Sequence, residues 1–140
     1  MRIEHIGIAV RNLDEAIHFY ENVLGLHCTG IEEVSDQAVK TAFFAVGETR
    51  VELLESTNPD GPVARFIGKK GEGVHHISFL VQNLSKALEE LESKGVRLVD
   101  KEPRRGAEGV NVAFLHPAST HGVLIELCER RAGTSSPSIV

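Results

Sequence analysis

Apolar and polar residues alternate with the period of a strand at the start of the chain and again near its middle. Residues 2–10 and 74–81 are rich in β-branched and apolar side chains, which is typical of strands. After each run the spacing of apolar residues changes to three or four, which is typical of a helix, and a glycine follows each helical segment. The pattern therefore predicts a strand followed by a helix twice, with the helices at 13–24 and 84–94.

Three more strands are expected after each helix, and a turn-rich connection separates the two halves. The expected strands cover residues 26–33, 37–46 and 49–55 in the first half and 96–100, 110–115 and 122–129 in the second. The connection at 57–72 contains "NPDG", which favours a turn, and is predicted to hold one short helix at 62–69. The tail at 131–140 is polar and has no period, so we expect it to be disordered.

The two halves of the chain resemble each other. The segment "IEHIGIAVRNLDEAI", which starts at Ile3, matches "VHHISFLVQNLSKAL", which starts at Val74, at six of fifteen positions, where chance would give about one. The ends of the halves match as well, since "VELLE" at 51–55 resembles "IELCE" at 125–129. The chain is therefore predicted to contain two copies of one unit.

This repeat defines the expected fold class, because each unit holds one strand, one helix and three further strands. The prediction is an α+β protein whose two tandem βαβββ units, at about 1–56 and 73–130, form a curved mixed sheet around a metal-binding cleft. The units make one expected domain at 1–130, and a chain of 140 residues is long enough for one such core.

Composition narrows the classes of partner. The net charge is −5, and nucleic acid requires a basic surface, so nucleic acid is not expected as a partner. No apolar run reaches the roughly 20 residues of a membrane helix and no signal peptide opens the chain, so we expect no membrane association and a cytoplasmic location. Cys28 and Cys128 lie far apart in the sequence and are expected to be reduced thiols.

Histidines occur in both strands that open the units. Side chains alternate across a strand, so His5 and His76, which align in the repeat, lie on the face opposite the bulky residues. A small residue, Gly7 or Ser78, stands beside each of them and leaves space for a cavity. His75 has the opposite parity and is expected on the helix side, as a rim or structural residue.

A glutamate occurs at matching places near the end of each unit. Glu52 and Glu126 are flanked by apolar residues within strands, where a carboxylate is costly unless it is paired or binds a metal. Two His and two Glu suit a divalent ion such as Co²⁺, Mn²⁺, Ni²⁺, Zn²⁺ or Fe²⁺. The sequence therefore predicts a metal centre made of His5, Glu52, His76 and Glu126.

Three stretches that cover nearly the whole chain carry a family resemblance. They are "IEHIGIAVRNLDEAIHFYENVLGL", "VGETRVELLESTNPDGPVARFIGKKGEGVHHISFLV" and "FLHPASTHGVLIELCE", of which the second is the most specific. With these stretches the chain resembles the vicinal oxygen chelate superfamily and, within it, the methylmalonyl-CoA epimerases. The resemblance implies paired βαβββ units around a metal. It places the metal ligands of that family at His5, His76 and Glu126, and the fourth ligand, often glutamine in the family, at Glu52.

The resemblance also implies an activity, which is the interconversion of the 2R and 2S forms of methylmalonyl-CoA by a homodimer that uses a divalent metal ion. One group removes the C2 proton and another returns it, while the metal stabilises the enolate. Some epimerases carry an extra carboxylate in the strand at 37–45, but this chain has no free carboxylate there or at 110–115. Glu52 and Glu126 are therefore the expected catalytic bases, and Lys40 is a weaker candidate. The cationic candidates for the CoA phosphates are Lys69, Lys70, Lys101, Arg104 and Arg105.

Three other functions share parts of this pattern. Glyoxalase I of the bacterial type has the same His-Glu-His-Glu ligand set, so the ligands alone do not separate the two enzymes. The double histidine and the linker helix favour the epimerase. An extradiol dioxygenase would use two His and one carboxylate from one unit of a longer chain. A metal-free binding protein of the same fold would not need the four ligands.

Overall fold

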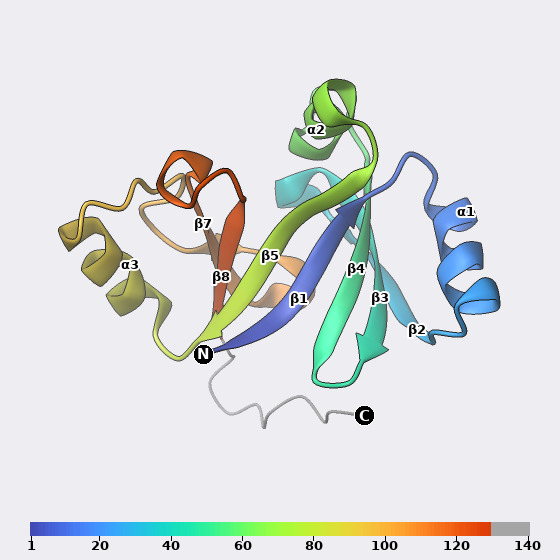
Figure 1. Cartoon of the computed structure of the whole chain (residues 1–140), viewed down its shortest axis with the longest axis horizontal. Helices are drawn as coiled ribbons and strands as arrows, with labels where there is room; N and C mark the ends of the chain where they lie inside the picture. The colour runs from blue at the N-terminus through green and yellow to red at the C-terminus, as the bar shows by residue number, and fades with distance from the viewer. Residues whose placement is uncertain (130–140) are drawn as a thin grey trace.

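The computed structural model describes residues 1–129 as an eight-stranded sheet with three α-helices (Figure 1). The strands are β1 (Arg2–Ala9), β2 (Cys28–Val34), β3 (Val39–Val46), β4 (Thr49–Ser56), β5 (Gly73–Val81), β6 (Arg104–Arg105), β7 (Asn111–Leu115) and β8 (Ile125–Glu129). The helices are α1 (Leu13–His18), α2 (Pro62–Lys70) and α3 (Leu84–Ser93). The tail at 131–140, which was expected to be disordered, lies outside the described residues.

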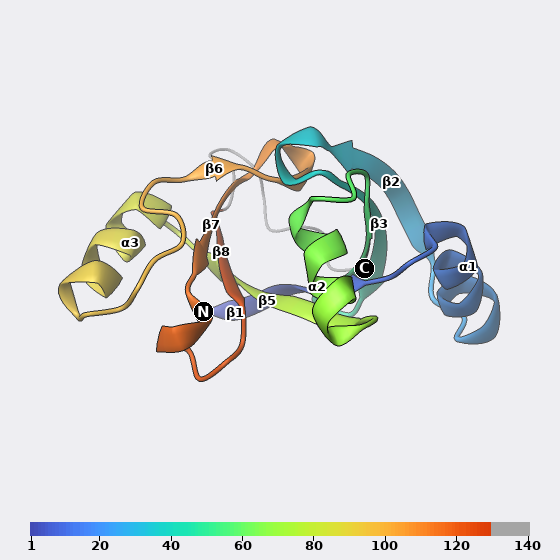
Figure 2. The same cartoon turned by 90° about the horizontal axis from the view of Figure 1, so that it is seen from above.

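The order of strands in the sheet follows the internal repeat. The order is β2-β3-β4-β1-β5-β8-β7-β6, with β1 and β5 as an antiparallel pair at the centre. In each unit the first strand pairs in parallel with the last one, β1 with β4 and β5 with β8. The predicted α+β fold of two βαβββ units in a curved mixed sheet is confirmed. The sheet curls, and α1 and α3 lie outside it at opposite ends of the molecule (Figure 2).

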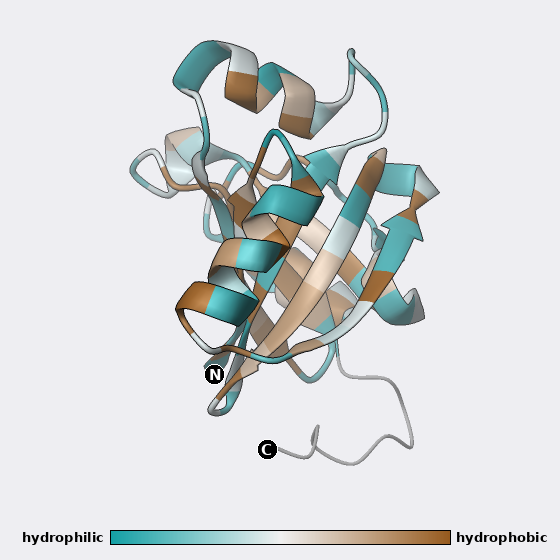
Figure 3. Cartoon of the chain, turned by 90° about the vertical axis from the view of Figure 1, so that its right-hand side faces the viewer, coloured by the Kyte–Doolittle hydropathy of each residue, from teal (hydrophilic) through white to brown (hydrophobic). Residues whose placement is uncertain are grey.

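The helix that follows the first strand of each unit starts at the same signal and covers an apolar cluster. The side chains of Asn12 and Asn83, which align in the repeat, accept hydrogen bonds from backbone N–H groups in the first turns of α1 and α3. Leu13 of α1 belongs to one buried cluster with residues of β3 and β4, and Leu84 and Leu88 of α3 belong to another with residues of β7 and β8. Burial of such a leucine stabilises the fold by about 1.5–3 kcal/mol. Figure 3 faces the α1 end and shows this helix lying across the strands.

Two of the predicted elements differ from the structure. The helix expected at 13–24 is α-helical only to His18 and continues as a π-helical turn at Phe19–Val23. The strand expected at 96–100 is wrong, because only Leu98 forms an isolated bridge there and the edge strand is β6. The backbone N–H groups of residues 99 and 100 both donate to the carbonyl of Phe114, and the Asp100 carboxylate accepts the N–H of Phe114, so no regular ladder continues.

The structure of residues 1–129 also describes the two cysteines and the apolar character of the helices. Cys28 and Cys128 are free thiols, as expected from their separation in the sequence. None of the helices within residues 1–129 has both the length and the apolar character that crossing a membrane requires.

Candidate metal centre in the cleft

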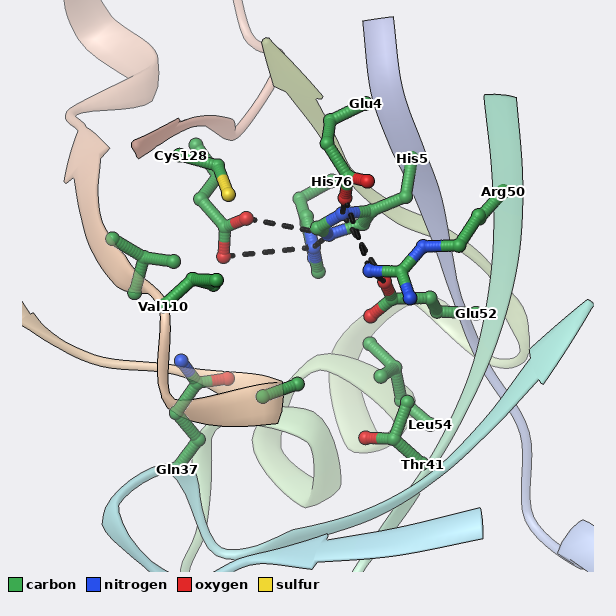
Figure 4. A pocket seen from close by; sticks show the side chains of 13 residues that line it. Glu4, His5, Gln37, Thr41, Arg50, Glu52, Leu54, His76, Val110 and Cys128 are labelled. Carbon is green, nitrogen blue, oxygen red and sulfur yellow. Dashed lines mark hydrogen bonds and ion pairs between the residues drawn. The ribbon is translucent and has the colours of Figure 1, made fainter. Parts of the chain in front are cut away.

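A pocket lies on the inner face of the curved sheet and is lined by both units (Figure 4). Its lining residues are Glu4, His5, Gln37, Thr41, Arg50, Glu52, Leu54, His76, Ala107, Val110, Val112, Glu126 and Cys128. All four residues predicted from the sequence as metal ligands are therefore in one place. Each of the four is buried.

The register of the central strand pair brings the two histidines together. On β1 His5 faces Ser78, and on β5 His76 faces Gly7, so each histidine lies opposite a small residue of the other unit. A Cβ atom at Gly7 would lie 2.4 Å from Cε1 of His76, which is closer than any normal contact. The space that the small residue was expected to leave is thus filled by the imidazole of the other unit.

His5, His76 and Glu126 form one group of potential metal donors. The Nε2 atoms of the two histidines lie 3.0 Å apart. The Glu126 carboxylate reaches both, with Oε1 at 3.3 Å from His5 Nε2 and Oε2 at 3.9 Å from His76 Nε2. Within residues 1–129, Glu126 Oε1 is buried and has no hydrogen-bond partner. An unsatisfied carboxylate oxygen beside two imidazole nitrogens is the environment that a divalent cation would satisfy.

Glu52 lies in the same pocket but at the other edge of the His5 ring. Its Oε2 atom is 3.2 Å from His5 Nδ1 and 3.1 Å from a terminal nitrogen of Arg50. A second group of potential metal donors therefore consists of Glu4, His5 and Glu52. The structure brings three of the predicted ligands to one point and places the fourth on the opposite edge of the shared histidine.

Two charged residues of the pocket, Glu4 and Arg50, were not predicted from the sequence as site residues. Glu4 Oε1 lies 2.6 Å from His5 Nδ1 and 3.2 Å from the Arg50 guanidinium. Strand parity assigns Glu4 to the helix side, but the pairing of β1 with β5 shifts register at this residue and its side chain reaches the pocket. Burial raises the pKa of Glu4, but its contacts with His5 and Arg50 outweigh burial and lower the pKa to about 2. The Arg50 guanidinium also pairs with Glu108, whose loop belongs to the second unit.

His75 lies outside the pocket lining. Its imidazole packs against the Phe66 ring of α2, with ring centroids 5.0 Å apart. Its Nδ1 atom is 2.9 Å from Nδ1 of His76, on the edge of the His76 ring that faces away from His5. Burial lowers the pKa of His75 to about 4, so the imidazole is neutral at neutral pH.

The electrostatics of the pocket follow from burial and from the number of carboxylates. Burial raises the pKa of Glu52 to about 7 and also raises the pKa of Glu126. Burial opposes a charged His5, but the carboxylates around it, Glu52 first, raise its pKa to about 9. Burial and the neighbouring His5 lower the pKa of His76 well below its usual value. The pocket therefore favours positive charge between its carboxylates. The imidazole nitrogens of His5 and His76 and the unpaired Glu126 oxygen fit a divalent metal ion.

Other candidates from the sequence lie elsewhere. Lys40 is exposed and is absent from the pocket lining, whereas its neighbour Thr41 is buried and faces the pocket. None of the five cations considered for the CoA phosphates lines the pocket. Lys69 and Lys70 end α2, and Lys101, Arg104 and Arg105 lie in or just before β6. Two of these cations have acidic neighbours, since Lys101 is 4.0 Å from Glu92 and Arg104 is 3.6 Å from Asp100.

Comparison with known proteins agrees with this fold. The family model described as Glyoxalase/Bleomycin resistance protein/Dioxygenase superfamily matches residues 4–114. The Bacillus subtilis protein YqjC is 49% identical over 128 residues, which are 91% of each chain. The mitochondrial methylmalonyl-CoA epimerase of Homo sapiens is 39% identical over 127 residues, which are 90% of this chain and 72% of that protein.

The fold is also similar to that of a solved methylmalonyl-CoA epimerase structure. A variant of Streptomyces coelicolor methylmalonyl-CoA epimerase, in complex with 2-nitronate-propionyl-CoA, has a TM-score of 0.92 and 38% identity over 98% of this chain and 99% of that one. Fold, pocket and family match together define a protein of the glyoxalase superfamily. Within that superfamily the chain belongs to the methylmalonyl-CoA epimerase family, whose members are isomerases. The resemblance found in the sequence is therefore confirmed.

Proposed function

We propose that the protein interconverts the 2R and 2S forms of methylmalonyl-CoA and that a divalent metal ion bound in the pocket is required. The observation that carries this proposal is the buried convergence of His5 Nε2, His76 Nε2 and the Glu126 carboxylate. It occurs in a fold shared with an epimerase that binds a CoA analogue, 2-nitronate-propionyl-CoA.

The proposed ligands are His5, His76, Glu126 and Glu52, and the ion is Co²⁺, Mn²⁺, Ni²⁺ or Zn²⁺. When bound, the ion acts as a Lewis acid that stabilises negative charge on the thioester oxygen as the C2 proton leaves. Glu52 is proposed as the fourth ligand because it is buried in the same pocket and has the same place in its unit as Glu126. Its contact with Arg50 at 3.1 Å means that the guanidinium competes for this carboxylate.

We propose that Glu52 and Glu126 also exchange the proton at C2. Epimerisation needs one group on each face of the carbon, one to remove the proton and one to return it. Glu52 comes from β4 and Glu126 from β8, and these strands flank the central pair β1 and β5 on its two sides. Glu52 contacts the Nδ1 edge of His5 and Glu126 contacts its Nε2 edge. The two carboxylates thus lie at opposite edges of the His5 ring, which supports this pair as the proposed bases.

The CoA moiety is proposed to lie outside the pocket, with only the acyl group inside. The five cationic candidates agree with this, since none of them lines the pocket. Lys69, Lys70 and Arg105 form no ion pair within residues 1–129, which leaves their charges available to phosphate. The homodimer that the family resemblance implies is tested by the mass in solution, against 15.3 kDa for one chain.

Turnover of two substrates separates this proposal from glyoxalase I, which uses the same kinds of ligand. The protein is loaded with Co²⁺ and given either (2S)-methylmalonyl-CoA or the hemithioacetal of methylglyoxal and glutathione. Chiral analysis is expected to show formation of the 2R epimer, with no conversion of the hemithioacetal. The reaction should stop with EDTA and in His76→Ala. Conversion of the hemithioacetal alone would reject the proposed substrate in favour of glyoxalase I.

A further inference from the structure

The residue before each metal-binding histidine occupies an irregular place in the central strands. The pairing of β1 with β5 shifts register twice. The first shift leaves Glu4 without an opposite residue on β5, and the second leaves His75 without an opposite residue on β1. An extra residue of this kind is a β-bulge, which changes the direction of its side chain. Glu4 and His75 are also equivalent in the internal repeat, so both units carry a bulge at the same position.

Both bulge residues contact the Nδ1 atom of the histidine that follows them. Glu4 Oε1 lies 2.6 Å from Nδ1 of His5, and His75 Nδ1 lies 2.9 Å from Nδ1 of His76. In both histidines Nδ1 therefore contacts a bulge residue, and Nε2 faces the proposed metal site. In each unit the residue that precedes the histidine thus contacts the ring nitrogen that faces away from the other histidine. That residue is a glutamate in the first unit and a histidine in the second.

We propose that Glu4 and His75 are positioning residues, which hold the Nδ1 proton of His5 and His76 and so direct both Nε2 lone pairs to the metal. The inference rests on the metal centre proposed above. An imidazole binds a metal through an unprotonated nitrogen, so its other nitrogen must carry the proton and needs an acceptor. Two Nε2 atoms 3.0 Å apart, both aimed at one cation, need such an acceptor behind each ring.

The two acceptors differ in what they allow. Glu4 also lies 3.2 Å from the Arg50 guanidinium, so it is an ionised carboxylate that can only accept. It keeps a proton on His5 Nδ1 whether or not a metal is bound, and Glu52 Oε2, at 3.2 Å from the same nitrogen, is a second acceptor. A neutral His75 either donates or accepts, so its Nδ1 atom can accept the Nδ1 proton of His76.

Long-range ¹H–¹⁵N NMR of the imidazoles tests the tautomers directly, with no substrate present. His5 is expected to carry a proton on Nδ1 both in the metal-free protein and with Zn²⁺, and His76 is expected to carry its proton on Nδ1 with Zn²⁺. An Nδ1 atom of His5 without a proton, in either state, overturns the inference. These spectra use the unmodified protein, so they decide the matter even if a variant fails to fold.

Zn²⁺ titration calorimetry of matched variants tests the same point by affinity. Glu4→Gln and His75→Gln keep an oxygen that can accept, whereas Glu4→Leu and His75→Phe do not. Loss of the acceptor should weaken Zn²⁺ binding about 10–100-fold, and the Gln variants should stay within a few-fold of the parent. Glu48→Leu and His27→Phe, at exposed positions away from the pocket, are the controls and should bind like the parent. Equal affinities for Gln and apolar variants would overturn the inference, whereas a parent that binds no Zn²⁺ would refute the metal centre itself.

Discussion

The Nε2 atoms of His5 and His76 lie 3.0 Å apart although 71 positions separate the two residues in the chain. The contact exists because each histidine lies in the first strand of its unit and those two strands form the central antiparallel pair. Neither unit alone contains the site. The duplication that is visible in the sequence is therefore what creates the metal centre proposed here.

Replacing Gly7 should disturb the site without touching a ligand. In Gly7→Ala the new methyl group would lie 2.4 Å from the His76 ring, which must move. We expect a loss of about 1–3 kcal/mol in the free energy of unfolding and weaker metal binding. Gly30→Ala is the control, because Gly30 is also in a strand and has open space where the Cβ would lie. Urea unfolding of both variants measures the effect, and an equal change in the two would contradict the close packing of His76 on Gly7.

Removal of the metal should destabilise the protein. An ion that binds only the folded state at 100 times its dissociation constant adds about 2.7 kcal/mol to the free energy of unfolding. EDTA should therefore lower the melting temperature of the Zn²⁺-loaded parent and leave His76→Ala nearly unchanged. Calorimetric melting with and without Zn²⁺ measures both. Equal stabilisation of the parent and His76→Ala by Zn²⁺ would place the ion elsewhere.

The ion pairs of Glu4 should make the metal-free protein sensitive to acid. The pKa of Glu4 falls from 4.5 to about 2 on folding, so the folded state favours the ionised form. Its contribution is present above pH 4.5 and is lost as the pH falls through 2, and it amounts to about 3 kcal/mol. The stability of the parent should thus approach that of Glu4→Gln over this range. Denaturant unfolding at several pH values gives this difference, and a constant gap between pH 5 and pH 2.5 would argue against the ion pairs.

The two proposed bases should each serve one enantiomer. Glu52→Gln and Glu126→Gln keep an oxygen that can bind the metal but cannot accept the C2 proton as a carboxylate does. With metal bound, each variant should exchange the C2 proton of one enantiomer with solvent and fail with the other, and the two variants should make opposite choices. Deuterium incorporation into each pure enantiomer measures this. Exchange of both enantiomers at the parent rate in both variants would mean that the bases are other residues.

The sequence predicted those features of the fold and site that depend on local pattern and on the repeat. The alternation along the first strand of each unit was enough to predict that His5 and His76 share one pocket. The repeat was enough to predict that Glu52 and Glu126 lie there too. Parity failed at Glu4, because a bulge changes the direction of one side chain and leaves no mark on the pattern of apolar residues.

Other features depend on contacts between segments that are distant in the sequence. Arg50 reads as an ordinary exposed cation at the start of a strand, but in the structure it lies between Glu4, Glu52 and Glu108. The pairing of Glu52 with Arg50 agrees with strand alternation, since residues two apart share a face, but the contacts of Arg50 with Glu4 and Glu108 depend on other segments. The failed strand at 96–100 has a similar cause, since Asp100 binds the backbone of Phe114 from across the sheet edge.

Deuterium wash-in at C2 of methylmalonyl-CoA tests the central claim most directly. The Co²⁺-loaded protein is mixed with (2S)-methylmalonyl-CoA in heavy water, and the deuterium at C2 and the ratio of epimers are followed by mass spectrometry and chiral analysis. The proposed function predicts deuterium at C2 together with approach to an equal mixture of epimers, and loss of both after EDTA treatment. Substrate that keeps its proton and its configuration in the presence of bound metal would contradict the proposed function.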